Sequence, residues 1–151
     1  MNAAHLHLII NHFPLIGLLF SILVLSWGLF RSNREWIRVG LVITVLSGLV
    51  AIPTFLTGEP SEKIIKNLPI FSEPLVEEHE EAAEFAIWFT EITALLSVGG
   101  LYFSIKKNSF PKPLVIAIVA VHIFTLTVLA RTNYLGGKIS HPEVRDDFKT
   151  P

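Results

Sequence analysis

A histidine and six glutamates are gathered in one stretch, EEHEEAAEFAIWFTE, which covers residues 77–91. Glu77, Glu84 and Glu91 are each two helical turns apart, so a helix places all three on one face. Negative charge at a solvated helix N-terminus explains the first residues of the stretch without any chemistry. Glu91 needs another explanation, because it lies within a hydrophobic segment, where an ionisable side chain is costly and usually functional.

Histidines from other parts of the chain are the natural partners of these carboxylates. His12 lies in the opening motif HLHLIINHFP, His122 lies inside the last apolar segment, and His141 follows that segment. The helical rise puts His12 about 8 Å, Glu91 about 10 Å and His122 about 14 Å inside the apolar region. We therefore expect His12, Glu91 and His122 to lie in the same half of a membrane.

Four apolar segments of membrane-spanning length must position these side chains. Hydrophobic residues make up 51% of the 151-residue chain and charged residues only 17%, with a mean hydropathy of +0.56. Apolar segments of about 20 residues predict transmembrane helices. We predict spans at about 8–30, 39–55, 85–103 and 114–130, a loop at 58–84 and a polar tail at 131–151. The predicted fold class is all-α, a single domain that forms an integral membrane antiparallel four-helix bundle.

Turn and cap residues set the expected ends of these helices. Ser72 is a candidate N-cap for a third helix that reaches about Ser104. Pro60 opens a short surface helix in the loop between the second and third spans. Gly136-Gly137 is expected to form a turn beyond the fourth helix, because glycine readily adopts positive φ at a helix end.

The charges at the span ends predict the orientation. The loop between the first two spans and the loop between the last two are short and contain one acidic residue, Glu35. Their basic residues are Arg31, Arg34, Arg38, Lys106, Lys107 and Lys112. Basic residues beside short loops favour the cytoplasmic side, so both termini and the acidic residues are expected to be extracytoplasmic. At that boundary we expect Glu84 to pair with Arg131, since pairing offsets the cost of a charge near hydrocarbon.

Three explanations fit the intramembrane polar residues. The first is structural, with His12, Glu91 and His122 forming hydrogen bonds between helices. The second is a b-type haem, heme b, held by two axial imidazoles in the bundle core. His12 and His122 are the expected axial pair, because the first and last helices of an up-down bundle are neighbours. Arg131 is then placed to meet a haem propionate near the surface.

The third explanation is a non-haem site for a zinc, iron or manganese ion. Imidazole and carboxylate ligands together suit these metals. His12, His79 and Glu84 are the candidate ligands, with His141 as a further one. The abundance of nearby carboxylates favours this site, whereas the intramembrane histidine favours haem. Neither alternative has a diagnostic ligand spacing.

Several other kinds of chemistry have no support in the sequence. The absence of cysteine excludes disulfides, thiolate ligands, iron–sulfur clusters and covalently attached c-type haem. No phosphate-binding loop, dinucleotide fingerprint or nucleophile-elbow motif occurs. No basic stripe indicates nucleic acid. The expected partners are the lipid bilayer and either a larger respiratory complex or a second copy of the chain.

The opening HLHLIINHFPLIG, the turn TGEPSEKI, the stretch EEHEEAAE and the closing RTNYLGGKISHPEV carry a family resemblance. Together they resemble an uncharacterised family of small bacterial four-span membrane proteins, with an H-F-P motif at the first helix and an L-G-G motif after the last. The resemblance implies a four-helix bundle in a bacterial inner membrane, and it implies no reaction. The residues that match its motifs are His12, Phe13, Pro14, Gly58, Glu59, Pro60, His79, Glu80, Glu84, Arg131, Gly136, Gly137, His141 and Glu143.

Taken together, the sequence predicts a multi-pass membrane protein with a site of histidines and glutamates on its extracytoplasmic side. The favoured function is a b-type haem protein that passes electrons within a respiratory membrane. The alternative is a non-haem metal-binding protein, or an accessory or structural subunit without redox activity. The sequence assigns no catalysed reaction.

Overall fold

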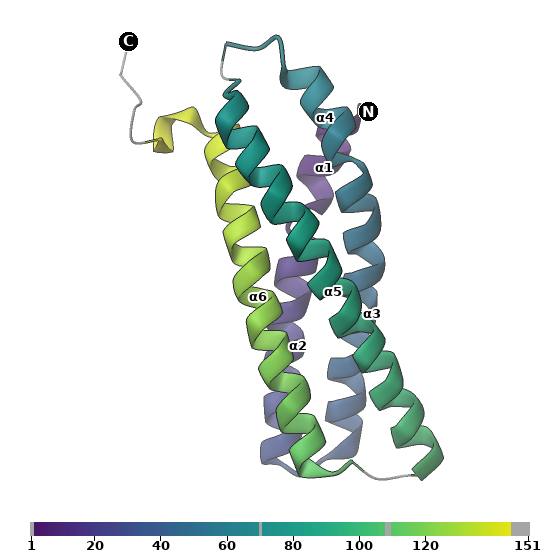
Figure 1. Ribbon diagram of the computed structural model, residues 1–151. Helices are drawn as coiled ribbons and strands as arrows, with labels where there is room; N and C mark the ends of the chain where they lie inside the picture. Colours follow the sequence, from purple (N-terminus) through teal and green to yellow (C-terminus); the bar gives the residue numbers. More distant parts are fainter. Residues whose placement is uncertain (1, 70, 108–109, 146–151) are drawn as a thin grey trace.

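The computed structural model describes residues 2–69, 71–107 and 110–145, and within these ranges it contains helices and no strand (Figure 1). Four segments, Ala3–Phe30, Arg34–Ile65, Glu73–Lys107 and Lys112–Ser140, are long and apolar enough to cross a membrane. The helices are α1 (Ala3–Ile10), α2 (Phe13–Phe30), α3 (Arg34–Leu56), α4 (Gly58–Ile65), α5 (Glu73–Lys107), α6 (Lys112–Ser140) and the short 3-10 helix η1 (Pro142–Val144).

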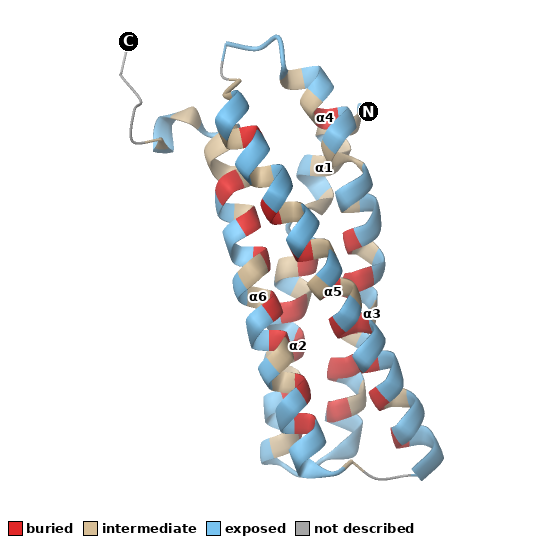
Figure 2. Ribbon diagram, in the orientation of Figure 1, coloured by how far each residue is buried: buried red, intermediate tan, exposed pale blue. Residues whose placement is uncertain are grey.

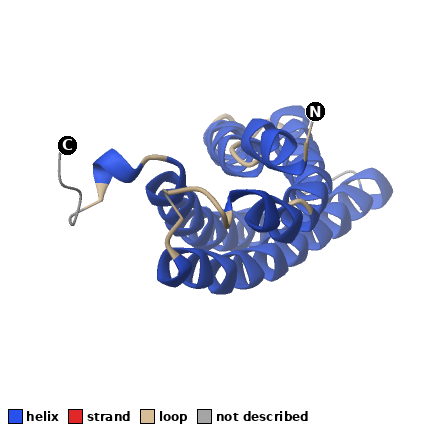
Figure 3. Cartoon of the chain, turned by 90° about the horizontal axis from the view of Figure 1, so that it is seen from above, coloured by secondary structure: helices blue, strands red, loops and turns tan. Residues whose placement is uncertain are grey.

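The four long helices form a closed antiparallel bundle. Helix α2 packs on α3, α3 on α5, α5 on α6, and α6 returns to α2. The view from above shows these helices around a common centre (Figure 3). Helix α1 begins and α6 ends at the same end of the bundle (Figure 1). The predicted all-α membrane bundle is confirmed, including the contact between its first and last long helices.

The burial pattern is that of a membrane protein. Large apolar side chains such as Phe20, Trp27, Trp88 and Leu95 are exposed on the outer surface, where lipid would cover them. Buried residues face the bundle axis (Figure 2), and many of them are small or carry a hydroxyl group. Small and hydroxyl-bearing residues let transmembrane helices approach closely and hydrogen bond to one another. The outer surface therefore fits hydrocarbon, and the inner surface fits neighbouring helices.

Pro14 divides the first predicted span into two helices. Proline has no N–H to donate to the carbonyl four residues earlier, and its ring clashes with that carbonyl. Helix α1 accordingly ends at Ile10, and α2 begins at Phe13. The Ile10 carbonyl accepts a hydrogen bond from Thr54 Oγ1 of α3 at 3.4 Å instead. The predicted continuous helix over 8–30 is therefore replaced by a short α1 that packs mainly against α4.

The last helix is longer than the sequence indicates. The predicted turn at Gly136-Gly137 is wrong, because α6 continues through both glycines to Ser140 with no positive φ at any described glycine. The His141 amide closes the helix by donating to the Gly137 carbonyl at 2.9 Å. Gly136 serves close packing instead, since it faces the ring of His79 on α5. The first part of the predicted polar tail is thus helical, and residues 146–151 lie outside the described residues.

A hydrogen-bonded chain crosses the centre of the bundle. The fully buried His122 donates from Nδ1 to the Ile118 carbonyl at 2.8 Å. Thr44 of α3 donates its hydroxyl to His122 Nε2 at 2.7 Å. The hydroxyl of Ser21 on α2 lies 2.6 Å from that of Thr44 and 2.8 Å from the Gly40 carbonyl. These bonds satisfy the imidazole and tie α2, α3 and α6 together.

Candidate functional site

A cavity of about 700 Å³ lies at the end of the bundle where α1 begins and α6 ends. Parts of α1, α3, α4, α5 and α6 line it, together with Pro14 of α2. Its described lining contains no lysine and no arginine. The titratable side chains that line it are His7, Glu59, Glu62, His79, Glu80 and Glu84. The cavity therefore contains acidic side chains and histidines, and the rest of its lining is a mixture of apolar residues with serine, threonine and asparagine.

His7 is fixed in this cavity by the end of α3. Its Nδ1 lies 3.0 Å from the Thr54 carbonyl oxygen and 3.1 Å from Thr57 Oγ1. A carbonyl oxygen can only accept a hydrogen bond, so Nδ1 carries the proton and Nε2 keeps a lone pair. The break before Pro14 is what allows α1 to lie against α3 and α4. This placement of His7 is therefore a consequence of the H-F-P motif.

His79 is fixed in the same way from the other side. Its Nδ1 donates to the Thr132 carbonyl of α6 at 3.0 Å, and its ring lies against Gly136. The centroids of the His7 and His79 rings are 6.5 Å apart, and the ring planes are perpendicular. The imidazoles of His7 and His79 therefore lie near each other, and Nε2 of each ring has no hydrogen-bond partner among the described residues.

The carboxylates of the cavity lie close together. Glu59, Glu62 and Glu84 are near enough to Glu80 of α5 to act on it electrostatically. Carboxylates that are close to one another repel, and a bound cation relieves that repulsion. Glu59 is also bound to Lys63 at 2.7 Å on the exposed side of α4. The cavity thus concentrates negative charge beside its two imidazoles.

The predicted haem ligands are not brought together. His12 is exposed and donates from Nδ1 to Asn133 Oδ1 at 2.7 Å. Asn133 is eleven residues from His122 on α6, which corresponds to about 16 Å along the helix. Two axial ligands of one iron must be much closer than this. Both ring nitrogens of His122 are already bonded, to Ile118 and Thr44.

The expected pairing of Arg131 with Glu84 is wrong. Arg131 instead lies 3.4 Å from Glu78, and both side chains are largely exposed. Glu78 is six residues before Glu84, nearly two turns nearer the start of α5. Glu84 lines the cavity, so the two acidic residues lie in different surroundings. The similar depth of Glu84 and Arg131 indicated nothing about the rotation of α5 relative to α6.

His141 lies outside the cavity. It follows the end of α6, and its Nδ1 lies 2.9 Å from Glu143 Oε1. Hydrogen bonding to the backbone and to His141 lowers the pKa of Glu143 below its ordinary value. Both side chains are exposed, and neither contributes to the cavity lining. Of the four predicted metal ligands, the cavity therefore contains His79 and Glu84, but neither His12 nor His141.

Two residues that line this cavity, His7 and Asn11, were not among the predicted ligands. Their spacing of four residues nevertheless places both on one helix face. Asn11 lines the cavity, and its Oδ1 is buried without a hydrogen-bond partner among the described residues. Within the described residues, no group of three or more His, Asp or Glu side chains is already arranged around one point that could hold a metal ion. The His7–His79 pair is the candidate core of a site.

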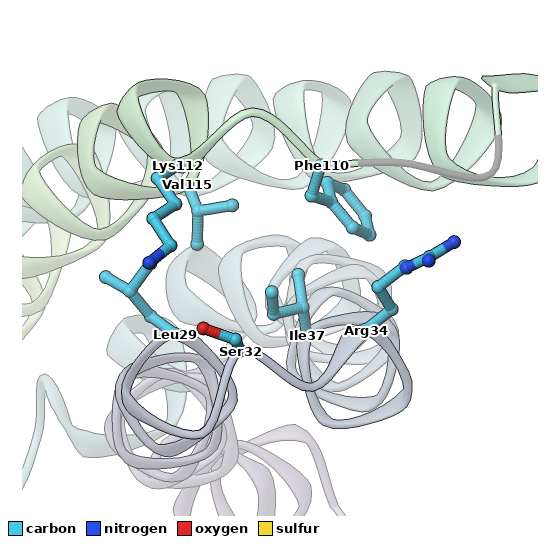
Figure 4. Close-up of a pocket in the computed structure, with 7 residues that line it drawn as sticks. All are labelled: Leu29, Ser32, Arg34, Ile37, Phe110, Lys112 and Val115. Carbon is cyan, nitrogen blue, oxygen red and sulfur yellow. The ribbon is translucent and has the colours of Figure 1, made fainter.

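A second, smaller cavity of about 180 Å³ lies at the opposite end of the bundle. Leu29, Ile37, Phe110 and Val115 form its apolar wall. Its charged residues are Arg34 and Lys112, and the Arg34 side chain points away from the others in Figure 4. This end contains no carboxylate or histidine in its described lining, so it offers no metal site.

Comparison of the chain with protein-family models, with curated proteins and with solved structures found no match. The arguments for function therefore rest on the residues of the chain itself.

Proposed function

We propose that this multi-pass membrane protein binds a transition-metal ion through His7 and His79. The main observation in favour of this proposal is that the two rings form the same kind of hydrogen bond. Each donates Nδ1–H to a backbone carbonyl, of Thr54 in one case and of Thr132 in the other. Metal-binding histidines typically donate their second ring N–H in this way, which fixes the tautomer and the ring orientation.

The separation of the rings supports a shared ion. With metal–nitrogen bonds of about 2.0–2.1 Å, two imidazoles on one ion have ring centroids about 5–6 Å apart. The centroids of His7 and His79 are 6.5 Å apart. A shift of about 1 Å closes this difference, which is within the reach of side-chain rotation. Water or a cavity carboxylate such as Glu80 would complete the coordination.

The charge of the cavity favours a cation over haem. The carboxylates of Glu62 and Glu80 line the cavity and would stabilise a dication there, because opposite charges attract. Haem propionates are anionic, and the described lining offers them no Lys or Arg. The haem alternative with His12 and His122 therefore has less support from the geometry. Imidazole ligands suit zinc, copper, iron and nickel.

We further propose that the protein resides in a bacterial inner membrane with this cavity on the extracytoplasmic side. The short basic loops lie at the opposite end of the bundle, and basic residues beside short loops favour the cytoplasm. A site open to the outside suits metal capture or retention by a membrane protein or by an accessory subunit of a larger complex. A second copy of the chain is the other candidate partner.

Zinc titration of the purified full-length protein tests the metal proposal. We expect one ion per chain, observed by calorimetry and by elemental analysis of the washed protein. His7→Ala and His79→Ala should each weaken zinc binding at least about 100-fold, since even the hydrogen-bond partners of ligating histidines are worth about 10–100-fold. His5→Ala is the matched control, because His5 is on the same helix and exposed, and it should leave the affinity unchanged.

Two results would contradict the proposal. One is a stoichiometry well below one ion in the wild-type protein. The other is equal binding by the His7→Ala, His79→Ala and His5→Ala variants, which would show that zinc binds to scattered surface groups. An optical spectrum of the oxidised and dithionite-reduced protein tests the haem alternative in the same sample, since a b-type haem gives intense reduced-state bands.

A further inference from the structure

Glu91 is a carboxyl group in the membrane interior that the cavity site does not use. It lies within α5, and its Oε1 is buried without a hydrogen-bond partner among the described residues. Gly48 of α3 is its neighbour, because a Cβ at that glycine would lie 3.6 and 3.7 Å from the two carboxyl oxygens. The same Cβ would approach Ala94 to 2.7 Å. The absence of a side chain at Gly48 therefore lets α3 approach Ala94 of α5, and the Glu91 carboxyl lies beside this close contact between α3 and α5.

The helices around Glu91 offer no positive charge. Helix α3 has no titratable residue between Arg38 and its end, and α2 has none at all. Helix α6 contributes only His122 between Lys112 and Arg131. Both nitrogens of His122 are bonded to Ile118 and Thr44, in the arrangement of a neutral imidazole.

An ionised Glu91 would therefore be a half-buried charge in the membrane interior, with no positive partner among the described residues. Such a charge is costly in a membrane interior, and a carboxyl group avoids the cost by keeping its proton. On α5 itself the nearest titratable residue is Glu84, two turns away, and it is acidic. No described group on α2, α3, α5 or α6 near Glu91 therefore supplies the positive charge that would stabilise its carboxylate form.

The base of the acidic cavity lies close to Glu91. Thr90 and Ile87 of α5 belong to the cavity lining, as does Ala51 of α3. Ala51 is three residues from Gly48, a distance of about 4.5 Å along the helix. The Glu91 carboxyl, which lies beside Gly48, is therefore about one helical turn along α3 from the cavity lining at Ala51.

We propose that Glu91 is a membrane-embedded proton-binding site, protonated at neutral pH, that exchanges its proton with the acidic cavity. The ligand is the proton, and the binding group is the Glu91 carboxylate. This site stands independently of the metal proposal, since it depends on the surroundings of Glu91 and not on His7 or His79. It gives the protein a group that can take up and release one proton from the cavity side.

A hydrophobic carbodiimide tests the proposal in the intact protein. Dicyclohexylcarbodiimide adds to a protonated carboxylic acid: the acid gives its proton to one nitrogen, its oxygen bonds to the central carbon, and an acyl shift forms a stable N-acylurea. Nothing leaves, so the labelled peptide gains the whole mass of the reagent. We expect labelling at Glu91 at pH 7 in the wild-type protein, loss of that adduct in Glu91→Gln, and retention in Glu84→Gln. Labelling confined to peptides without Glu91, together with an infrared difference spectrum that contains no protonated carboxyl band, overturns the proposal.

Infrared spectroscopy keeps the test decisive if the reagent cannot enter the helix interface. We expect the spectrum of the wild-type protein at pH 7, after subtraction of the Glu91→Gln spectrum, to contain the C=O band of a protonated carboxylic acid, and this band should shift in D2O. The spectrum of Glu91→Asp, after the same subtraction, should also contain such a band. The other carboxyl groups of the chain, such as those of Glu62 and Glu80, cancel in this difference. A difference spectrum with only carboxylate bands at pH 7 overturns the proposal, whatever the reagent does.

Discussion

Replacement of Gly136 by alanine is the most direct probe of the contact that holds His79 in place. The added Cβ would lie 3.2 Å from Cε1 and 3.6 Å from Nδ1 of the His79 ring. The ring cannot move away freely, because Nδ1 is bonded to the Thr132 carbonyl, one turn earlier on the same helix. We therefore expect Gly136→Ala to displace His79 by a few tenths of an ångström and to strain or lengthen that hydrogen bond.

The magnitude follows from two opposing effects. Alanine is favoured over glycine inside a helix by about 0.8–1.0 kcal/mol. Inserting a methyl group into a well-packed contact costs about 1–3 kcal/mol. Gly137 supplies a matched control, since a Cβ there meets nothing within 4 Å. Gly137→Ala should therefore stabilise the protein by up to about 1 kcal/mol, and Gly136→Ala should be about 1–3 kcal/mol less stable than Gly137→Ala.

Unfolding in mixed detergent measures both variants against the wild-type protein, and zinc titration measures the consequence for the cavity. Gly136→Ala should weaken zinc binding, because it moves one of the two proposed ligands, whereas Gly137→Ala should not. Equal stability of the two variants would refute the close contact between Gly136 and His79. If Gly136→Ala is destabilised but binds zinc normally, the contact between Gly136 and His79 is supported and His79 is not a zinc ligand.

Three further predictions concern the core, the surface and the orientation. Thr44→Val should lower the free energy of unfolding by about 1–3 kcal/mol, because it leaves Nε2 of the buried His122 without its hydrogen-bond donor. The control, Thr127→Val at an exposed position, should change that free energy by less than about 0.5 kcal/mol. Equal effects of the two variants on unfolding in detergent would contradict the hydrogen bond between Thr44 and His122. A double-mutant cycle of Arg131→Gln with Glu78→Gln should give a coupling free energy of at most about 1 kcal/mol, as exposed ion pairs do. If the cycle of Arg131→Gln with Glu84→Gln gives a larger coupling free energy than this, the observed pairing of Arg131 with Glu78 is contradicted. A reporter that is active only outside the cytoplasm should be active when fused after the last residue, and activity of a cytoplasmic reporter there would reverse the proposed orientation.

The sequence alone determined the class of the fold. Four apolar segments, each long enough to cross a bilayer, predict four helices, because backbone groups in hydrocarbon must be bonded within their own segment. The charged ends of those segments also located the loops. These properties are local, so each segment of the sequence contains the information that decides them. The expected neighbours, the first and last long helices, followed from the short loops of an up-down bundle.

Only the tertiary structure decided which polar side chains meet. The rotation of α5 relative to α6 paired Arg131 with Glu78 and left Glu84 in the cavity, although the helical rise predicts similar depths for Glu84 and Arg131. Depth depends on the helical rise, which is fixed, whereas rotation depends on packing between helices. For the same reason, His122 is bonded to Thr44 and is not paired with His12.

Local exceptions to helix rules also depended on tertiary contacts. Pro14 interrupts the predicted span over 8–30, and the packing of α1 against α4 brings the ring centroids of His7 and His79 to 6.5 Å from each other. Gly136 and Gly137 have the local signature of a helix end, yet α6 continues through both. Glycine permits a turn without requiring one, and here the ring of His79 fills the space beside Gly136. The sequence determined where chain direction could change, and the contacts between helices decided whether it did.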